Sequence, residues 1–167
     1  MTRILKSVAA AALACCAVGS AQAVVSSTSA SDWVLNPGGF GGAFDGVAKL
    51  LFSNSTGNYV CSGSLLAGGQ YVLTAAHCAD DFTSMTADFK LGSVSANVVS
   101  ATVHSGWDGT LGTGADIAVL RLDRTITGIE GFTLSNSNDV GKNILLAGYG
   151  VVGTGSTGGI DFDRDAP

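Results

Sequence analysis

Short apolar runs separated by turn-forming residues most limit how this chain can fold. Each run is five to ten residues long, and none has the 3.6-residue periodicity of a long amphipathic helix. Polar clusters such as SNSTGN (53–58) and AGG (67–69) separate the runs, as turns do. We therefore expect strands at 47–52, 59–66, 70–74, 94–103, 117–122 and 144–149.

Six short strands predict an all-β protein built as a small antiparallel barrel or sandwich. The 24 glycines and the low charged fraction of 13% fit a fold with many tight turns. A helical turn is expected only in AAHCAD, residues 75–80. We place the folded domain at 47–150, after a flexible arm rich in Ser, Gly and Asn at 24–46. Residues 151–167 read as a Gly-rich linker with an acidic tail.

Residues 1–23 have the pattern of a secretory signal peptide. Arg3 and Lys6 precede the apolar stretch VAAAALACCAV, and AQA at 21–23 is a cleavage site of the small-x-small type. A lipoprotein signal ending at Cys15 is the alternative. The apolar stretch is too short to span a bilayer with its flanks. We therefore expect an exported protein, extracellular or periplasmic, whose mature form has no membrane segment.

The charge balance argues against a nucleic-acid partner. The formal net charge is −5, and cleavage of the expected signal peptide would remove Arg3 and Lys6 and make it −7. Binding to a phosphate backbone needs a Lys/Arg patch, which this composition does not supply.

Two cysteines, Cys61 and Cys78, remain in the expected mature chain. In an exported protein such a pair is expected to form one disulfide, with two free thiols as the alternative. Closing a loop of this size would stabilise the fold by about 3 kcal/mol through restriction of the unfolded chain.

His77 ends the run YVLTAAHCAD and has three possible roles: general base, metal ligand or structural residue. A zinc site would have to combine it with Cys61, Cys78 and His104. That spacing fits no usual zinc pattern, and the adjacent His77 and Cys78 cannot easily point at one ion. We expect no metal and no other cofactor.

A catalytic histidine requires a carboxylate that holds its ring in one tautomer. Asp116 is the candidate, because it stands directly before the alternating run IAVLRL. The alternative role for Asp116 is to cap that strand. The residues alone leave both possibilities open.

Three motifs, CSGSLL (61–66), YVLTAAHC (71–78) and DIAVLRL (116–122), resemble the trypsin/chymotrypsin-type serine proteases, particularly bacterial secreted members. The resemblance implies a two-barrel fold of which 47–150 is the first, six-stranded barrel. It implies that His77 is the general base, that Asp116 orients it, and that Cys61 bonds to Cys78. VHSGW (103–107) resembles the stretch that precedes the family's Asp, which would make His104 structural. AGYG (147–150) resembles the stretch that closes the first barrel.

The family's nucleophilic serine lies in a GDSGG motif of the second barrel, and this sequence contains no such motif. GSTGG (155–159) would put Thr157 in that place, with Ser156 before it. Its Gly/Thr/Ser composition and its position only 41 residues after Asp116 indicate a linker instead. VVSS after Ala23 also matches the family's usual mature terminus, IVGG, poorly.

We therefore expect a secreted trypsin-like endopeptidase, acting on proteins or peptides, represented by a part that lacks its nucleophile and is inactive alone. A second chain carrying the other barrel is a further possibility. The alternative function is a non-catalytic single-barrel module that binds proteins. Asp80, Asp81 and Asp88 could ligate calcium, but solvated surface carboxylates are the simpler interpretation.

Overall fold

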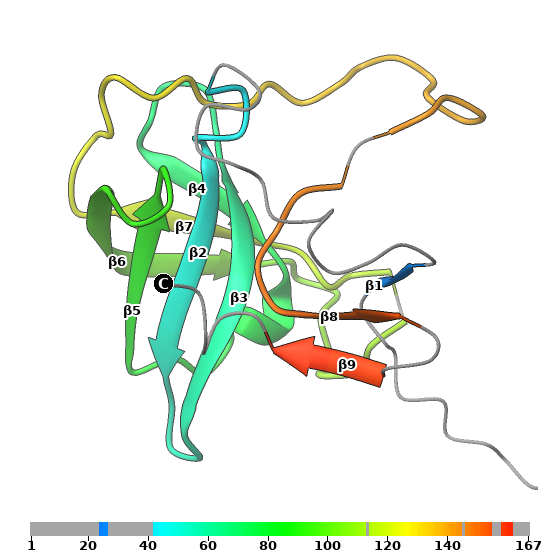
Figure 1. The fold of residues 1–167 in the computed structure, drawn as a ribbon. Coiled ribbons are helices and arrows are strands. Elements are labelled where there is room, and N and C mark those ends of the chain that lie inside the picture. Colours follow the sequence, from blue (N-terminus) through cyan, green and yellow to red (C-terminus); the bar gives the residue numbers. More distant parts are fainter. Residues whose placement is uncertain (1–23, 27–41, 113, 145, 155–157, 162–167) are drawn as a thin grey trace, which may run out of the picture.

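The structure is a computed structural model that describes residues 24–26, 42–112, 114–144, 146–154 and 158–161 (Figure 1). The signal peptide predicted at 1–23 and most of the arm predicted at 24–46 lie outside these residues, so both remain predictions. In the described ranges, no helix is long and apolar enough to cross a membrane.

Six strands form a closed antiparallel barrel in the order β2-β3-β4-β7-β6-β5. Every pairing is between antiparallel strands, and β2 pairs with both β3 and β5 to close the barrel. The all-β antiparallel barrel expected from the sequence is confirmed. The strands are β2 (Val47–Ser53), β3 (Asn58–Leu65), β4 (Tyr71–Thr74), β5 (Ser84–Phe89), β6 (Val94–Val103) and β7 (Ala118–Leu122).

Alternate residues of the strands fill the barrel, because successive side chains of a strand point to opposite faces. In β2 the alternate residues Ala48, Leu50 and Phe52 are buried, as is Val47 at the start of the strand, whereas Leu51 is 39% exposed. The largest fully buried side chains in the described structure are Phe89, Leu50, Leu65, Leu120, Leu122 and Val72.

The predicted set of strands is wrong at one position: β5 completes the barrel, and 144–149 forms no strand in its described residues. β5 has the sequence SMTADF, in which Met85, Ala87 and Phe89 are buried between exposed or half-buried polar residues. In the segment 144–149, by contrast, Ile144 and Leu146 are 71% and 75% exposed. An apolar run was therefore mistaken for a strand, and a more polar strand was missed.

The end of this segment is attached to the barrel by one serine. The Ser62 hydroxyl donates to the Tyr149 carbonyl (3.0 Å) and accepts from the Tyr149 N–H (2.6 Å). A Cβ atom on Gly148 would lie 2.8 Å from Ser62 Oγ, so glycine is needed there for this approach. AGYG therefore lies against β3, without belonging to its sheet.

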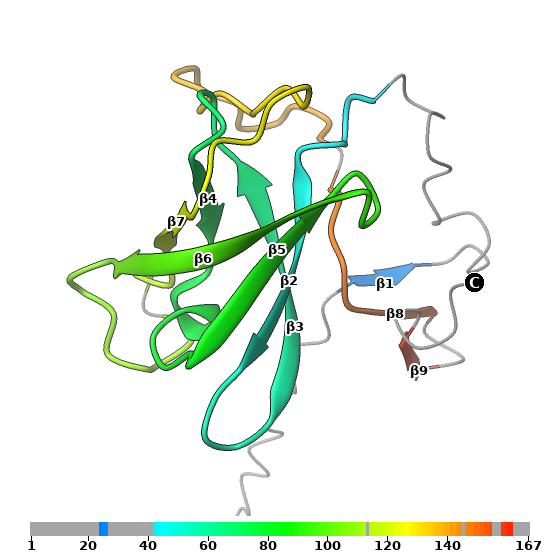
Figure 2. The ribbon, with the colours of Figure 1, turned by 90° about the vertical axis from the view of Figure 1, so that its left-hand side faces the viewer.

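Three further strands, none of them predicted, form a small separate sheet. β1 (Val24–Ser26) pairs in parallel with β8 (Val151–Thr154), which pairs antiparallel with β9 (Gly158–Asp161). Figure 1 and the rotated view in Figure 2 both place this sheet beside the barrel.

Candidate active site

The pairing of β4 with β7 brings His77 and Asp116 together. Thr74, the last residue of β4, pairs with Ala118, the first residue of β7. His77 follows Thr74 in a short 3₁₀ helix (η2, Ala76–Cys78), and Asp116 precedes Ala118. Antiparallel strands place these two segments at the same end of the pair. The helical turn expected in AAHCAD is thus confirmed.

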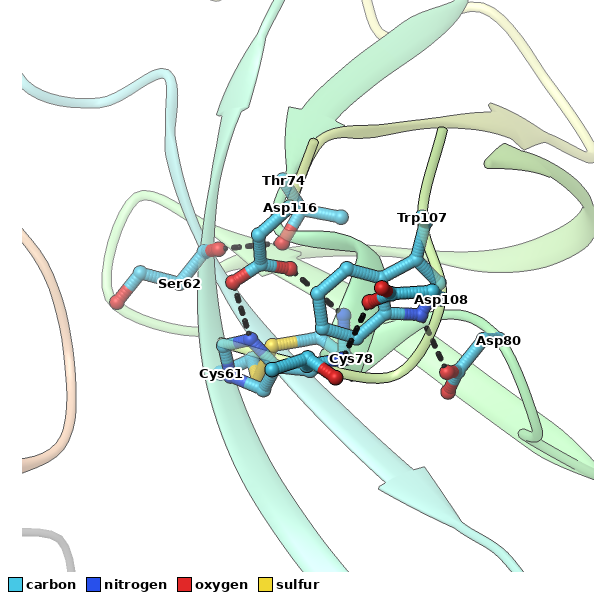
Figure 3. Close-up of polar contacts among 10 residues, drawn as sticks. Cys61, Ser62, Thr74, Cys78, Asp80, Trp107, Asp108 and Asp116 are labelled. Atoms are coloured by element: carbon cyan, nitrogen blue, oxygen red, sulfur yellow. Dashed lines mark hydrogen bonds and ion pairs between the residues drawn. A yellow bond between two sulfur atoms is a disulfide. The ribbon is translucent and has the colours of Figure 1, made fainter. Parts of the chain in front are cut away.

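Asp116 contacts His77 with both of its carboxylate oxygens (Figure 3). Oδ1 accepts the backbone N–H of His77 at 2.9 Å, and Oδ2 lies 2.8 Å from the ring nitrogen Nδ1. Because a carboxylate can only accept, this contact places the proton of the neutral ring on Nδ1. Nε2 then carries the lone pair, which is the arrangement that a general base requires.

Two opposing effects act on the pKa of Asp116, and the net result is a lowered pKa. Partial burial raises it. The hydrogen bonds from the His77 backbone and side chain, the charge of His77 and a hydrogen bond from the Ala76 backbone lower it more. The side chain of Asp116 is 25% exposed and that of His77 is 49% exposed. The carboxylate is therefore held charged beside a ring that solvent can reach.

A disulfide holds the helix η2 against β3. Cys61 of β3 is bonded to Cys78, with Cα atoms 6.3 Å apart. The Thr74 hydroxyl also donates to the Ser62 carbonyl at 2.8 Å (Figure 3). The backbone on both sides of His77 is thereby tied to the same strand, which restricts how far the imidazole can move. The disulfide predicted from the sequence is confirmed.

A contact between Trp107 and Asp80, not foreseen from the sequence, joins the loops that carry the two site residues. The Trp107 indole N–H donates to Asp80 Oδ2 at 2.7 Å (Figure 3). Asp80 follows His77, and Trp107 stands in the segment that leads to Asp116. The aromatic residue in VHSGW was the only available signal, and it did not specify a partner.

His104 takes no part in the hydrogen bonds between His77 and Asp116, although its backbone N–H donates to the carbonyl of Ile117, next to Asp116, at 2.9 Å. Its Nδ1 accepts the backbone N–H of Gly106 at 3.1 Å within the turn that follows β6. This contact fits the structural role inferred for His104. Thr157 and Ser156 of the GSTGG stretch lie outside the described residues.

The residues present do not favour a metal site. Among the described residues, the only group of three close potential ligands is Cys61, His77 and Cys78. Both sulfurs belong to the disulfide and are not available as thiolates.

The acidic residues considered for calcium do not form a cluster of three among the described residues. Each carboxylate accepts from a different neutral side chain: Asp80 from Trp107, Asp81 from Asn54 and Asp88 from Ser95. These contacts fit solvated surface carboxylates.

Comparison with known protein families finds one family model that matches the chain. The family model described as Trypsin matches residues 41–160, which is well over half of the sequence. The chain belongs to the trypsin family. The matched region of this trypsin-family chain contains the whole barrel, the disulfide between Cys61 and Cys78, and both residues of the candidate site. No curated protein matches the chain significantly.

One solved protease structure shares the fold, and a second shows a weaker similarity. A collagenase structure ("HL collagenase") is 23% identical with a TM-score of 0.51, over 57% of this chain and 44% of that one. The protease Anisep from Arthrobacter nicotinovorans is 21% identical with a TM-score of 0.42, over 52% of this chain and 44% of Anisep. This trypsin-family chain thus spans less than half the length of the structures it matches.

Proposed function

We propose that this chain supplies the general base and its orienting carboxylate to a secreted trypsin-like serine endopeptidase. His77 is the base and Asp116 is the residue that orients it. The observation that carries the proposal is the double contact of Asp116 with the backbone and ring of His77. Membership of the trypsin family supports a protein or peptide as the substrate.

The proposed chemistry is that of the Ser-His-Asp triad, as it is known for trypsin-like proteases. His77 Nε2 takes the proton of a serine hydroxyl as that oxygen attacks the scissile carbonyl carbon. His77 then gives the proton to the leaving amine, and water completes hydrolysis of the acyl-enzyme by the same route. Asp116 stays ionised and stabilises the imidazolium that forms between these steps.

We further propose that the nucleophilic serine lies outside residues 1–167, in a second barrel. The sequence holds no GDSGG motif. The two hydrogen bonds of His77 described above are both made with Asp116. In this proposal 47–150 is the first barrel, and 151–167 is the Gly-rich linker with its acidic tail. Residues 1–23 direct export, which fits the disulfide between Cys61 and Cys78.

The test begins with the gene and ends with activity. The DNA that follows the codon for Pro167 is sequenced and translated in all three forward frames. A barrel that contains GDSGG is expected there or in a co-purifying chain. The complete protein should hydrolyse a casein substrate, and a fluorophosphonate probe should label its serine. His77→Ala should lower kcat/KM by about four orders of magnitude or more. His104→Ala is the matched control and should leave the rate within a few-fold.

A complete protein that neither reacts with the probe nor cleaves peptides would overturn the proposal. So would a His77→Ala variant with unchanged kcat/KM. The single-barrel binding module would then be the remaining function for this fold.

A further inference from the structure

A pocket of about 410 Å³ opens beside His77, and the proposed chemistry does not account for its composition. Its walls include Phe52 from the end of β2, Tyr59 from the start of β3, and Trp107. His77, Asp80 and Asp81 also line it. A group bound in this pocket would touch the candidate base directly.

The charge of the pocket is negative and is not balanced by its own walls. Asp80 and Asp81 are exposed, and their partners, Trp107 and Asn54, are neutral hydrogen-bond donors. No lysine or arginine lines the pocket, and the ion pairs found in the described part of the chain involve other carboxylates. Two negatively charged residues therefore line a space that is large enough for a side chain.

The same walls offer aromatic surface. The rings of Phe52 and Tyr59 stack with centroids 5.4 Å apart, and Tyr59 is 44% exposed. The hydrogen bond to Asp80 fixes the Trp107 indole next to that carboxylate. Aromatic faces attract cations, and the stems of lysine and arginine pack on apolar surface while their charged ends stay hydrated.

We propose that this pocket receives a lysine or arginine side chain of the peptide substrate, close to the bond that is cleaved. The inference rests on the proposed function, because the pocket is a substrate subsite only if His77 is the catalytic base. Asp80 and Asp81 are then specificity-determining residues. The negative charge selects a cation, and the aromatic walls select one with a long stem, with arginine favoured because its planar guanidinium also stacks on rings.

The test measures binding without turnover, on the 167-residue chain. The probe is the peptide acetyl-Gly-Gly-Arg-Gly-Gly-amide, titrated into isotopically labelled protein and followed by NMR. It should shift the indole N–H signal of Trp107 and the amide signals of Asp80 and Asp81. The same peptide with citrulline in place of arginine has nearly the same shape without the charge, and should bind several-fold more weakly.

Two variants assign the charge to its residues. Asp80→Asn and Asp81→Asn keep an oxygen acceptor for Trp107 and Asn54, so the fold is expected to survive. Each should weaken arginine-peptide binding by about two- to fivefold, the range of an exposed charge pair. Asp88→Asn is the matched control, since Asp88 bonds to Ser95 on β6 and does not line the pocket. It should leave the affinity unchanged.

Equal binding of the citrulline and arginine peptides, or unchanged affinity in both pocket variants, would overturn the proposal. Signals that shift elsewhere on the barrel would do the same. The outcome is separate from that of the protease test. Binding without any protease activity would remove the proposed function and leave a cation-binding pocket, whereas protease activity without binding would remove only the pocket.

Discussion

Asp116 engages the same residue twice, through the backbone and through the ring. The backbone contact fixes where the carboxylate sits, and the ring contact then fixes which nitrogen carries the proton. A single contact would leave the carboxylate free to rotate. Both oxygens are therefore needed to set the position and the tautomer of His77 at once.

Asp116→Asn should disable the base while preserving the fold. An amide can still accept from the His77 backbone, but its NH₂ group would face Nδ1 and favour the tautomer with the proton on Nε2. In the complete protein of the proposed function, kcat should fall by about 10⁴-fold, which is the loss known for the Asp-to-Asn change in the Ser-His-Asp triad. Steady-state kinetics measure this loss, and near-normal kcat would contradict the assigned role of Asp116.

Acid should weaken the folded state in part through Asp116. Its pKa is lower in the folded chain than the ordinary value of 3.8. Its contribution to stability is therefore full above about pH 4 and is lost as pH falls through the folded pKa. Urea unfolding of the wild type and Asp116→Asn, at about pH 5 and pH 2.5, should show a stability difference that shrinks in acid.

Asp139 also has a lowered pKa, but it does not affect the comparison between the wild type and Asp116→Asn. Hydrogen bonds from Lys142, Ser135 and Ser137 lower the pKa of Asp139. Asp139 is present in both proteins, so its effect cancels in the difference. A stability difference that stays constant with pH would show that Asp116 does not titrate as described.

At the scale of elements, the barrel depends on which side of each strand faces inward. Leu50 and Leu51 are neighbours of the same residue type in β2, yet the first is fully buried and the second is 39% exposed. The strand therefore contains its own control for the energetic contribution of burial.

Leu50→Ala should lower the free energy of unfolding by about 2–5 kcal/mol, because it removes buried methyl groups and leaves a cavity. Leu51→Ala should cost about 1 kcal/mol or less, since its side chain is partly solvated already. Chemical denaturation of both variants measures the difference. Equal losses would mean that β2 is not inserted in the register described.

The sequence predicted the closely spaced motifs better than the long-range contacts. The barrel class, five of its six strands and the disulfide followed from apolar alternation and from the cysteine pair. β5 was missed because SMTADF carries few large apolar residues, and its burial comes from pairing with β2 and β6. Ile144 and Leu146 looked like strand residues because composition does not reveal whether an apolar run finds a partner.

In the candidate site, too, the sequence predicted one contact and not another. The motifs predicted that His77 and Asp116 act together, and the structure places their side chains 2.8 Å apart. The bond from Trp107 to Asp80 joins residues 27 positions apart through side chains alone. No local pattern encodes such a contact, because it depends on how the two loops lie in the folded chain.

At the scale of the whole molecule, the segment 134–146 carries four strongly exposed large apolar side chains among its described residues. Leu134, Val140, Ile144 and Leu146 are between 69% and 90% exposed. Figure 1 shows this yellow-to-orange segment leaving the barrel and returning along it. Large apolar side chains exposed within one segment favour association with other protein surface.

The 167-residue chain should therefore self-associate at high concentration. Sedimentation velocity should show an apparent mass that rises with concentration, and the triple variant Leu134→Ser, Ile144→Ser, Leu146→Ser should remain monomeric at several-fold higher concentration. Leu111→Ser is the control, because Leu111 is 62% exposed in a different loop. A wild type that stays monomeric throughout would contradict the expectation.

The pairing of Thr74 with Ala118 also bears on how such proteins can diverge. Everything between η2 and Asp116, including β5 and β6, leaves this strand pair and comes back to it. A longer or shorter turn at 90–93, between β5 and β6, changes the length of that excursion without changing where it starts or ends. Separation along the chain is thus uncoupled from separation in space, and related genes can gain or lose codons there while the two side chains stay in register.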